Sequence, residues 1–296
     1  MNARAQTDFA CLDTLATAQL EVVGVRVAIG EKTLLHPTTC AFKAGQVTAI
    51  LGPNGAGKST LMSVLTGQRP PDAGHVRWHG RLMQSCVPAE MARVRAFVAQ
   101  ETQVAFDFTV REVVELGRYP HRRRPSRQES DIPNQAMQAT AVDHLADRTL
   151  NTLSGGEKAR AHLARALAQV WEGLEPPETR WLLLDEPTAA LDLAHQHRVL
   201  QLARHWATAQ GIGVVAVLHD LNLALRYSDC CVVLQHGQAV ASGATAEVLT
   251  PPCIAGVWGV AAWPVGVPAS CAASTATGQG ATGAALQYVF TPLACH

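Results

Sequence analysis

The sequence predicts an α/β fold built on a parallel sheet, with an antiparallel β-subdomain at its N-terminal end and an inserted α-helical subdomain. Apolar runs at residues 47–51, 181–184 and 214–218 alternate with helical patterns, which is typical of a parallel sheet. Residues 20–30 alternate loosely with period two and predict a strand ahead of that sheet. Residues from about 101 to 170 are largely helical in pattern, interrupted by an arginine-rich loop with prolines.

Two further short strands are expected at the N-terminal end. Residues 38–42 and 46–51 are both apolar enough to be strands. The segment Lys43-Ala44-Gly45 between them has the length and the glycine of a hairpin turn. We therefore predict that these two strands pair with each other before the parallel sheet begins.

The composition limits the class of protein. The chain has 296 residues, which allows one large domain or two ordinary ones. Lys plus Arg number 24, as do Asp plus Glu, so bulk positive charge is absent and we expect no nucleic-acid partner. Eight cysteines without a C-x-x-C pair indicate free thiols in a reducing compartment. The N-terminus has no apolar h-region, so we expect no secretory signal.

The residues after the first apolar run match the phosphate-binding pattern G-x-x-x-x-G-K-[ST] in full. Glycines let the backbone N–H groups curl around phosphate oxygens, and the helix that follows adds the positive end of its dipole. Lys58 is suited to neutralise β and γ phosphates, and Ser59 offers a hydroxyl to Mg²⁺. The predicted phosphate-binding residues are Gly52, Pro53, Asn54, Gly55, Ala56, Gly57, Lys58, Ser59 and Thr60. The sequence therefore predicts a P-loop NTPase core.

Two other strands end in residues that suit phosphate chemistry. The run at 181–184 ends in Asp185 and Glu186, which a parallel sheet places at its ligand crevice. We expect Asp185 near Mg²⁺, and Glu186 facing the γ-phosphate, where it can polarise an attacking water. His219 follows the run at 214–218 and is expected to hold the water and Glu186 in line.

A second phosphate-seeking helix start lies at the segment Leu153-Ser154-Gly155-Gly156-Glu157. Ser154 and Glu157 have the spacing of a capping box. The two glycines between them leave backbone N–H groups exposed, which makes the helix start an anion site. The chain thus carries two such starts, one after Gly57 and one after Ser154.

Together these segments resemble the ATP-binding subunit of ABC transporters over residues 20–255. GPNGAGKS resembles its Walker A motif, LLLDE its Walker B motif and LSGGE its signature motif. Ala190-Leu191-Asp192 is similar to its D-loop, Gln100 to its Q-loop glutamine and His219 to its switch histidine. Segments 117–121 and 191–197 and the insertion at 172–180 look like the importers of haem, iron-siderophores and vitamin B12, and the second segment looks most like hemin importers of Gram-negative bacteria.

The resemblance implies a function and a set of partners. Two copies pack head to tail, with ATP between the Walker A loop of one and the LSGGE helix of the other. Hydrolysis of ATP drives import of hemin through two separate permease subunits, supplied indirectly by a periplasmic binding protein, and the helical subdomain grips a permease helix. The subunit then lies peripherally on the cytoplasmic face of the inner membrane. Alternatives are import of an iron-siderophore or vitamin B12, or a soluble ABC-type ATPase without a permease.

The resemblance also assigns roles to residues, with ATP and Mg²⁺ as cofactors. The catalytic residues are Glu186, His219 and Lys58. Residues expected to contact the ATP of the partner subunit are Ser154, Gly155, Gly156 and Asp192. Residues expected to hold the metal are Ser59, Gln100 and Asp185.

Four features lie outside this agreement. The stretch Val27-Ala28-Ile29-Gly30 lacks the aromatic residue on which many relatives stack adenine, so we expect adenine to meet an aliphatic surface. The arginines at 118, 122, 123, 124 and 127 form a local basic cluster, either a docking surface for permease or headgroups or a solvated loop. His195 and His197, two apart on a helix, are expected to point away from each other. Cys230 and Cys231 are expected to be small core residues.

The C-terminal end differs from the rest in composition. Glu247 is the last charged residue, and the final 49 residues carry none. Residues from about 261 are rich in Ala, Gly, Ser and Thr, which predicts poor order. We therefore expect a nucleotide-binding domain at 20–255 and a low-complexity, uncharged tail at 256–296. Removal of residues 262–296 should leave ATP hydrolysis nearly intact.

Overall fold

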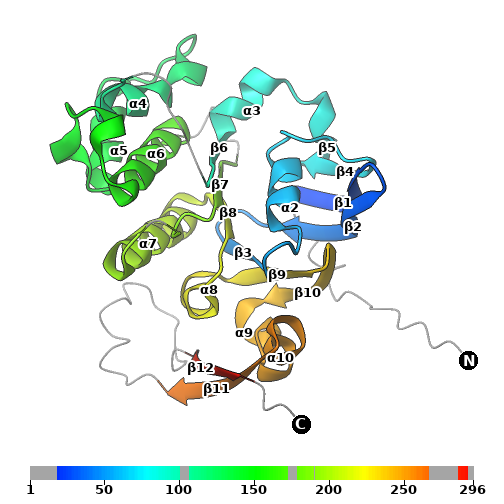
Figure 1. Cartoon of the computed structure of the whole chain (residues 1–296). Coiled ribbons are helices and arrows are strands. Elements are labelled where there is room, and N and C mark those ends of the chain that lie inside the picture. Colours follow the sequence, from blue (N-terminus) through cyan, green and yellow to red (C-terminus); the bar gives the residue numbers. More distant parts are fainter. Residues whose placement is uncertain (1–18, 101–106, 173–178, 190, 267–285, 293–296) are drawn as a thin grey trace, which may run out of the picture.

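A six-stranded sheet with the order β10-β9-β3-β8-β7-β6 forms the centre of the fold in the computed structural model, which describes residues 19–100, 107–172, 179–189, 191–266 and 286–292 (Figure 1). Its strands are β3 (Val47–Leu51), β6 (Arg95–Val98), β7 (Trp181–Asp185), β8 (Gly213–Val217), β9 (Cys230–Gln235) and β10 (Gln238–Ala244). All neighbours are parallel except β10, which runs antiparallel to β9. Every residue of β3, β7 and β8 is buried, as expected of strands covered on both faces. The predicted parallel α/β sheet is confirmed.

A second sheet of antiparallel strands, ordered β2-β1-β4-β5, forms the predicted β-subdomain. Its strands are β1 (Leu20–Ile29), β2 (Lys32–Phe42), β4 (Ala73–Trp78) and β5 (Arg81–Leu82). The predicted hairpin through Lys43-Ala44-Gly45 is wrong, because β2 pairs with β1 while β3 enters the central sheet. The β1–β2 hairpin turns instead at Gly30, whose φ of 57° suits glycine. The continuous apolar run of β3 is the reason: it buries both faces, which a half-exposed hairpin strand does not.

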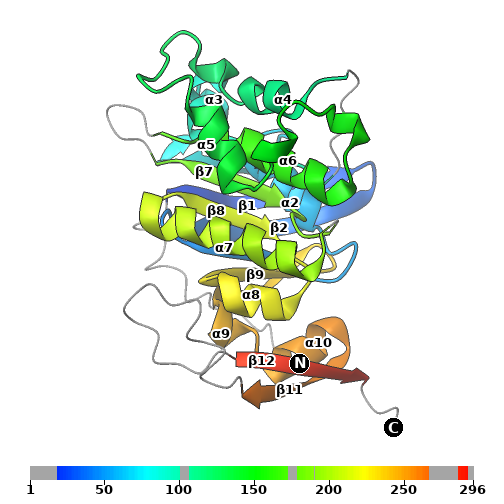
Figure 2. The ribbon, with the colours of Figure 1, turned by 90° about the vertical axis from the view of Figure 1, so that its left-hand side faces the viewer.

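Alternate residues of the central strands face two separate hydrophobic layers. Leu183, Val215 and Val217 pack with the antiparallel sheet and with α2 (Lys58–Leu65). Leu182 and Leu184 pack on the opposite side with the helical subdomain and with α7 (Leu193–Gln210). Figure 2 shows α7 and α8 (Leu221–Tyr227) covering that second face. The period-two alternation of side chains along each strand produces these two layers.

The inserted subdomain is helical, as predicted. Its helices are α4 (Val110–Leu116), α5 (Ile132–Ala139) and α6 (Gly155–Gln169), joined by short 3₁₀ turns. The remaining helices are α3 (Pro88–Val94), α9 (Thr245–Val248) and α10 (Pro251–Trp258). None of the helices in the described ranges has both the length and the apolar character needed to cross a membrane.

The C-terminal segment is more structured than its composition predicts. Strand β11 (Val260–Gly266) pairs antiparallel with β12 (Leu286–Pro292), so the expectation of poor order from about residue 261 is wrong for these two segments. Ala262 and Tyr288 are buried and belong to the same core as α7 and α8. Apolar and β-branched residues within the tail supply enough buried surface for a strand pair although no charge is present. Residues 267–285 and 293–296 lie outside the described ranges.

Candidate nucleotide-binding site

The phosphate loop joins the end of β3 to the start of α2, as the sequence predicts. Gly52 and Gly57 have φ values of 148° and 100°, and a Cβ at Gly52 would clash with the backbone oxygen of Leu234. No side chain caps the start of α2, so its first N–H groups face the loop. The Nζ of Lys58 donates to the carbonyl oxygens of Gly52 and Pro53, at 2.9 and 3.0 Å. The loop therefore has the curled form that surrounds a phosphate.

Lys58 is only 5% exposed and lies near two acids. Burial lowers its pKa, and the carboxylates of Glu186 and Asp185 oppose that shift. The two carboxylates favour the charged form of Lys58, and the phosphates of a nucleotide bound in the loop would favour it further.

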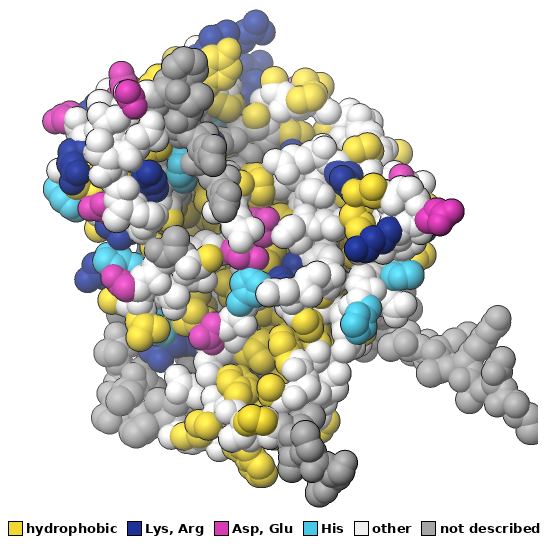
Figure 3. Space-filling view, in the orientation of Figure 1, with side chains coloured by type: hydrophobic (Ala, Val, Ile, Leu, Met, Phe, Trp, Pro, Cys, Tyr) yellow, Lys and Arg dark blue, Asp and Glu magenta, His cyan; other side chains and the backbone are white. Residues whose placement is uncertain are grey.

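The acids that end β7 meet the glutamine after β6 and the histidine after β8. Glu186 Oε1 lies 2.6 Å from Nε2 of His219, and Glu186 Oε2 accepts a hydrogen bond of 2.7 Å from Nε2 of Gln100. Glu186 has a φ of 51°, the left-handed region that non-glycine residues rarely adopt, a strained backbone of the kind that clusters at functional sites. Figure 3 shows acidic, basic and histidine side chains adjoining near the middle of this face. The three predicted residues Glu186, His219 and Gln100 are thus in contact.

Asp185 is buried beside this group, and its Oδ1 has no hydrogen-bond partner among the described residues. Burial raises its pKa, the charge of Glu186 raises it further, and Lys58 and His219 oppose both. An uncompensated buried carboxylate is costly unless a cation meets it. Together with the hydroxyl of Ser59 and the side-chain oxygen of Gln100 it provides the oxygen ligands that Mg²⁺ prefers. The residues present therefore fit a magnesium ion shared with phosphate.

A cavity of about 800 Å³ runs along the phosphate loop. At one end it is lined by Gln100, Glu186 and His219. At the other end it is lined by Lys32, Thr33, Leu34, His236 and Gly237, which the sequence did not predict. Ile29, at the end of the stretch where the sequence lacks the expected aromatic residue, is 57% exposed and is not among the residues that line this cavity.

The far wall comes from the turn between β9 and β10. The N–H of Gly237 donates to Ala56 of the loop at 3.1 Å, and the N–H of His36 donates to the carbonyl of Gly237 at 2.7 Å. His236 has a φ of 48° in this tight turn, which sets it beside the cavity. The adjacent "HG" dipeptide marks a turn in the sequence, but only the strand order reveals that it touches the phosphate loop.

The second predicted helix start lies away from this cavity. Ser154 caps α6 in a full capping box: its N–H and hydroxyl donate to Glu157 Oε2 at 2.8 and 2.7 Å, and the Glu157 N–H donates to Ser154 Oγ at 3.3 Å. These bonds with Ser154 lower the pKa of Glu157. Ser154 and Gly155 are exposed, and neither they nor Gly156 line the cavity. Within one chain the structure does not bring the signature segment to the phosphate loop.

Asp192 is the N-cap of α7 and is exposed as well. Its Oδ1 accepts from the N–H of His195 at 2.9 Å and lies 2.8 Å from that residue's Nδ1. These contacts lower the pKa of Asp192. His197 bonds instead to the hydroxyl of Tyr227 at 2.8 Å, so the two histidines point away from each other as predicted. Residue 190 of the predicted D-loop lies outside the described ranges.

The predicted basic cluster is not one surface. Arg118 is buried, forms an ion pair of 2.9 Å with Glu129 and donates to the carbonyl of Ala168 at 2.7 Å. Arg122 lies over the ring of Tyr119 at 4.3 Å. The exposed part is therefore limited to the arginines at 122, 123, 124 and 127, and Arg118 holds the subdomain together. Cys231 is buried as predicted, and burial raises the pKa of its thiol to about 12, whereas Cys230 at the start of β9 is only partly buried and the prediction is wrong for it.

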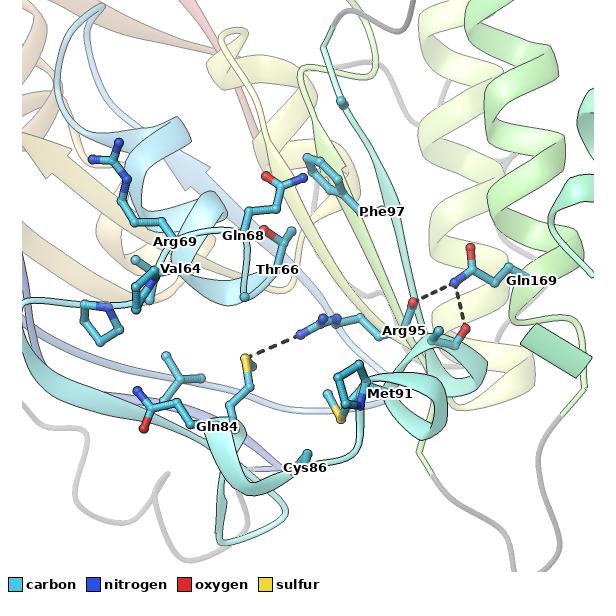
Figure 4. A pocket seen from close by; sticks show the side chains of 18 of the residues that line it. Val64, Thr66, Gln68, Arg69, Gln84, Cys86, Met91, Arg95, Phe97 and Gln169 are labelled. Atoms are coloured by element: carbon cyan, nitrogen blue, oxygen red, sulfur yellow. Dashed lines mark hydrogen bonds between the residues drawn. The ribbon is translucent and has the colours of Figure 1, made fainter. Parts of the chain in front are cut away.

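A second cavity of about 720 Å³ lies between the nucleotide core and the helical subdomain (Figure 4). Figure 4 shows Arg95 reaching across it toward Met83, and Gln169 donating to the carbonyls of Ala92 and Arg95 at 2.7 and 3.0 Å. His162 of α6 lines the same cavity and is buried, and neither of its ring nitrogens has a partner among the described residues. Burial, with the charges of Arg165 and Lys158, lowers its pKa to about 4. Ala99, which directly precedes Gln100 of the nucleotide site, also lines this cavity.

Comparison with known proteins gives consistent results. The family model described as "ABC transporter" matches residues 35–189. The hemin import ATP-binding protein of Methylobacillus flagellatus is 44% identical over 79% of this chain and 87% of its own, and that of Gloeobacter violaceus is 46% identical over 79% and 85%. Among solved structures, an inward-facing ABC transporter superposes with a TM-score of 0.72 at 25% identity, covering 94% of this chain and 98% of that one. A dimeric bacterial ABC transporter cassette superposes with a TM-score of 0.66 at 25% identity over 76% and 98%.

The range that the family model matches contains the phosphate loop, the acidic strand end and the signature helix of this chain. The loop and the strand end line one cavity together with His219, whereas the start of the signature helix is exposed. The chain belongs to the ABC transporter family and is the ATP-binding, ATP-hydrolysing subunit of such a transporter.

Proposed function

We propose that this chain energises import of hemin, by hydrolysing ATP as a homodimer bound to two permease subunits. The contact of Glu186 with both His219 and Gln100 carries the hydrolytic part of the proposal. The printed names of relatives at 41–46% identity support hemin as the cargo. A periplasmic binding protein would supply the cargo, and the subunit would act peripherally at the cytoplasmic face of the inner membrane.

In this proposal the chain's own residues divide the chemistry of hydrolysis. Glu186 Oε1 takes a proton from the attacking water, and His219 holds that carboxylate and the γ-phosphate in line, at the 2.6 Å contact already present. Lys58 and the N–H groups of the loop stabilise the negative charge that spreads over the γ-phosphate oxygens. Asp185, Ser59 and Gln100 would hold Mg²⁺, which supplies further charge neutralisation when bound.

The exposed helix start at Ser154 supports the homodimer. Its glycine N–H groups form an anion site, and the phosphate loop, which lies elsewhere in the described part of the fold, does not fill it. A second copy placed head to tail would present its ATP there, and Asp192 would lie beside it. ATP binding then closes the dimer and hydrolysis opens it.

The cavity between the nucleotide core and α6 supports docking of the permease. It is about 720 Å³ in volume, with apolar walls that include Met91, Phe97 and Leu116. Its lining includes Ala99, which directly precedes Gln100, so a permease helix seated there would sense the state of the nucleotide site through Gln100. We assign this cavity to the permease and not to a small molecule, because it joins the two subdomains that ATP would move.

Transport in proteoliposomes tests the proposed cargo. The chain is reconstituted with its two permease subunits, and ATP-dependent accumulation of hemin, a ferric siderophore and cobalamin is measured in parallel. We expect hemin alone to accumulate and Glu186→Gln to stop it. Accumulation of the siderophore or cobalamin instead would replace hemin by that cargo. Failure of the chain to bind any permease, with ATPase activity intact, would favour the soluble ATPase.

A further inference from the structure

The C-terminal strand β12 contacts the helix that follows the switch histidine. Figure 1 places β12 beneath α8, and the side chain of Asn222 forms two hydrogen bonds with the backbone of Tyr288. Asn222 Nδ2 donates to the carbonyl of Tyr288 at 3.0 Å, and the N–H of Tyr288 donates to Asn222 Oδ1 at 2.8 Å. The amide of Asn222 thus imitates the pair of bonds that a neighbouring strand would make.

The strand pair is arranged to leave Tyr288 free for this contact. Tyr288 lies opposite Pro264 of β11 in the register. Proline has no N–H to donate, so a position where the partner's backbone groups point away suits it. The ring of Tyr288 is buried in the core beside α8. Both the backbone and the side chain of Tyr288 therefore fix β12 to the body of the protein.

Asn222 lies three residues after His219, in the first turn of α8. Its own N–H donates to Asp220 Oδ1 at 2.7 Å, so it belongs to the N-cap of the helix. The other end of α8 is held by Tyr227, whose hydroxyl contacts His197. A seven-residue helix has little stability of its own, so external contacts decide where its first turn lies.

We propose that Asn222 is a positioning residue for ATP hydrolysis: by pairing with Tyr288 it makes the C-terminal strand a support that fixes the first turn of α8 and, through it, His219. The backbone of His219 is held on one side by Leu218, whose N–H donates to Ile50 at 3.1 Å, and on the other by the Asp220 cap. The contact with β12 stabilises the side held by the Asp220 cap. The proposal therefore contradicts the sequence-based expectation that the tail is dispensable for hydrolysis.

The consequence is a loss in turnover without a loss in ATP binding. His219 contacts Glu186, while the phosphates are bound by the loop on the other side of the cavity. A shift of the histidine by a fraction of an ångström would misalign the water and lower kcat. The loop would be unchanged, so the KM for ATP would stay the same.

Steady-state ATPase assays of the full chain test this proposal, since they concern Glu186 and His219 and do not depend on the transported cargo. The variants are Asn222→Ala, a chain ending after Ala285, and the two combined. Because every one of these variants lacks the Asn222–Tyr288 contact, and the proposal assigns the effect on His219 to that contact alone, we expect about the same 10-fold drop in kcat for all three, with KM for ATP within about 2-fold of the parent. Thr291→Val is the matched control: it removes the bond of 3.1 Å between Trp263 and Thr291 in the same strand pair and leaves Asn222 untouched.

Melting temperature separates positioning from simple destabilisation. We expect Thr291→Val to keep the parent kcat even if it lowers the melting temperature as much as Asn222→Ala does. Parent-like kcat in a folded chain ending after Ala285 would overturn the proposal, as would independent, multiplicative losses from truncation and Asn222→Ala. A rise in KM equal to the fall in kcat would also overturn it, because the contact would then act on ATP binding.

Discussion

The two helix starts that seek phosphate are built in opposite ways. The start of α2 has no side-chain cap, carries the buried Lys58 and lines a cavity together with Glu186. The start of α6 has a complete capping box and is exposed, and Ser154, Gly155 and Gly156 do not line that cavity. A helix end that is capped by its own side chains folds without a ligand, whereas one that is not capped gains its partners from the ligand. This difference agrees with the proposed homodimer, in which the first start binds the chain's own nucleotide and the second that of the partner.

The general base gives the strongest test of the first site. Replacing Glu186 by Gln keeps the hydrogen bond from Gln100 but removes the group that accepts a proton, so we expect hydrolysis to slow by at least ~100-fold. ATP should still bind, and an ATP-bound dimer should accumulate. Phosphate release and size-exclusion chromatography with ATP measure the two effects. Parent-like turnover would remove Glu186 from the role of base.

The division between the two helix starts is tested by complementation. Lys58→Ala removes the lysine that would bind phosphate at the first start. Ser154→Glu prevents phosphate binding at the second start by placing a negative charge where the partner's phosphate would bind. The substitution also removes the Ser154 cap of α6, so the melting temperature of Ser154→Glu is measured to confirm that the variant is folded. Each variant alone should be nearly inactive. An equal mixture should regain about a quarter of the parent activity, because half the dimers are mixed and each has one intact site. A mixture as inactive as its components would show that both starts act within one chain.

How far the sequence predicts this molecule depends on the range of the interactions involved. The phosphate loop, the acidic strand end and the capping box of Ser154 are local, so contiguous residues specify them and each was predicted at the right position. The β1–β2 pairing and the place of β3 depend on which distant strands meet, and here the predicted hairpin was wrong. His236 and Asn222 carry no local pattern at all, because the first gains its place from the contact of Gly237 with Ala56 and the second from Tyr288. The tail was misjudged because its composition hides two strands that are separated by 19 intervening residues, 267–285.

Two residues are candidates for the contact with the adenine base in the first site, His236 and Ile29. His236 lines the cavity, whereas Ile29 is exposed and lies outside it. If adenine stacks on His236, then His236→Ala should raise KM for ATP about 5-fold, the scale of ~1 kcal/mol for such a contact. His236→Tyr should restore it, and Ile29→Tyr should change nothing. A fall in KM with Ile29→Tyr would instead place adenine along β1.

The smallest expected effect concerns stability, and it sharpens the view that the first site is built for a ligand. Burial raises the pKa of Asp185 above its unfolded value, so the unfolded chain binds fewer protons than the folded chain near that pKa. The folded state is then favoured by this group at low pH, and the favour is lost as pH rises through the folded pKa. At neutral pH the charged carboxylate therefore destabilises the protein without nucleotide.

Asp185→Asn should raise the melting temperature at pH 7 by about 2 °C and by less at pH 4. Added Mg²⁺ and ATP should stabilise the parent more than the variant, because the charge that costs stability alone is the one that holds the metal. A lower melting temperature for Asp185→Asn at both pH values would show that Asp185 stabilises the fold even without a ligand.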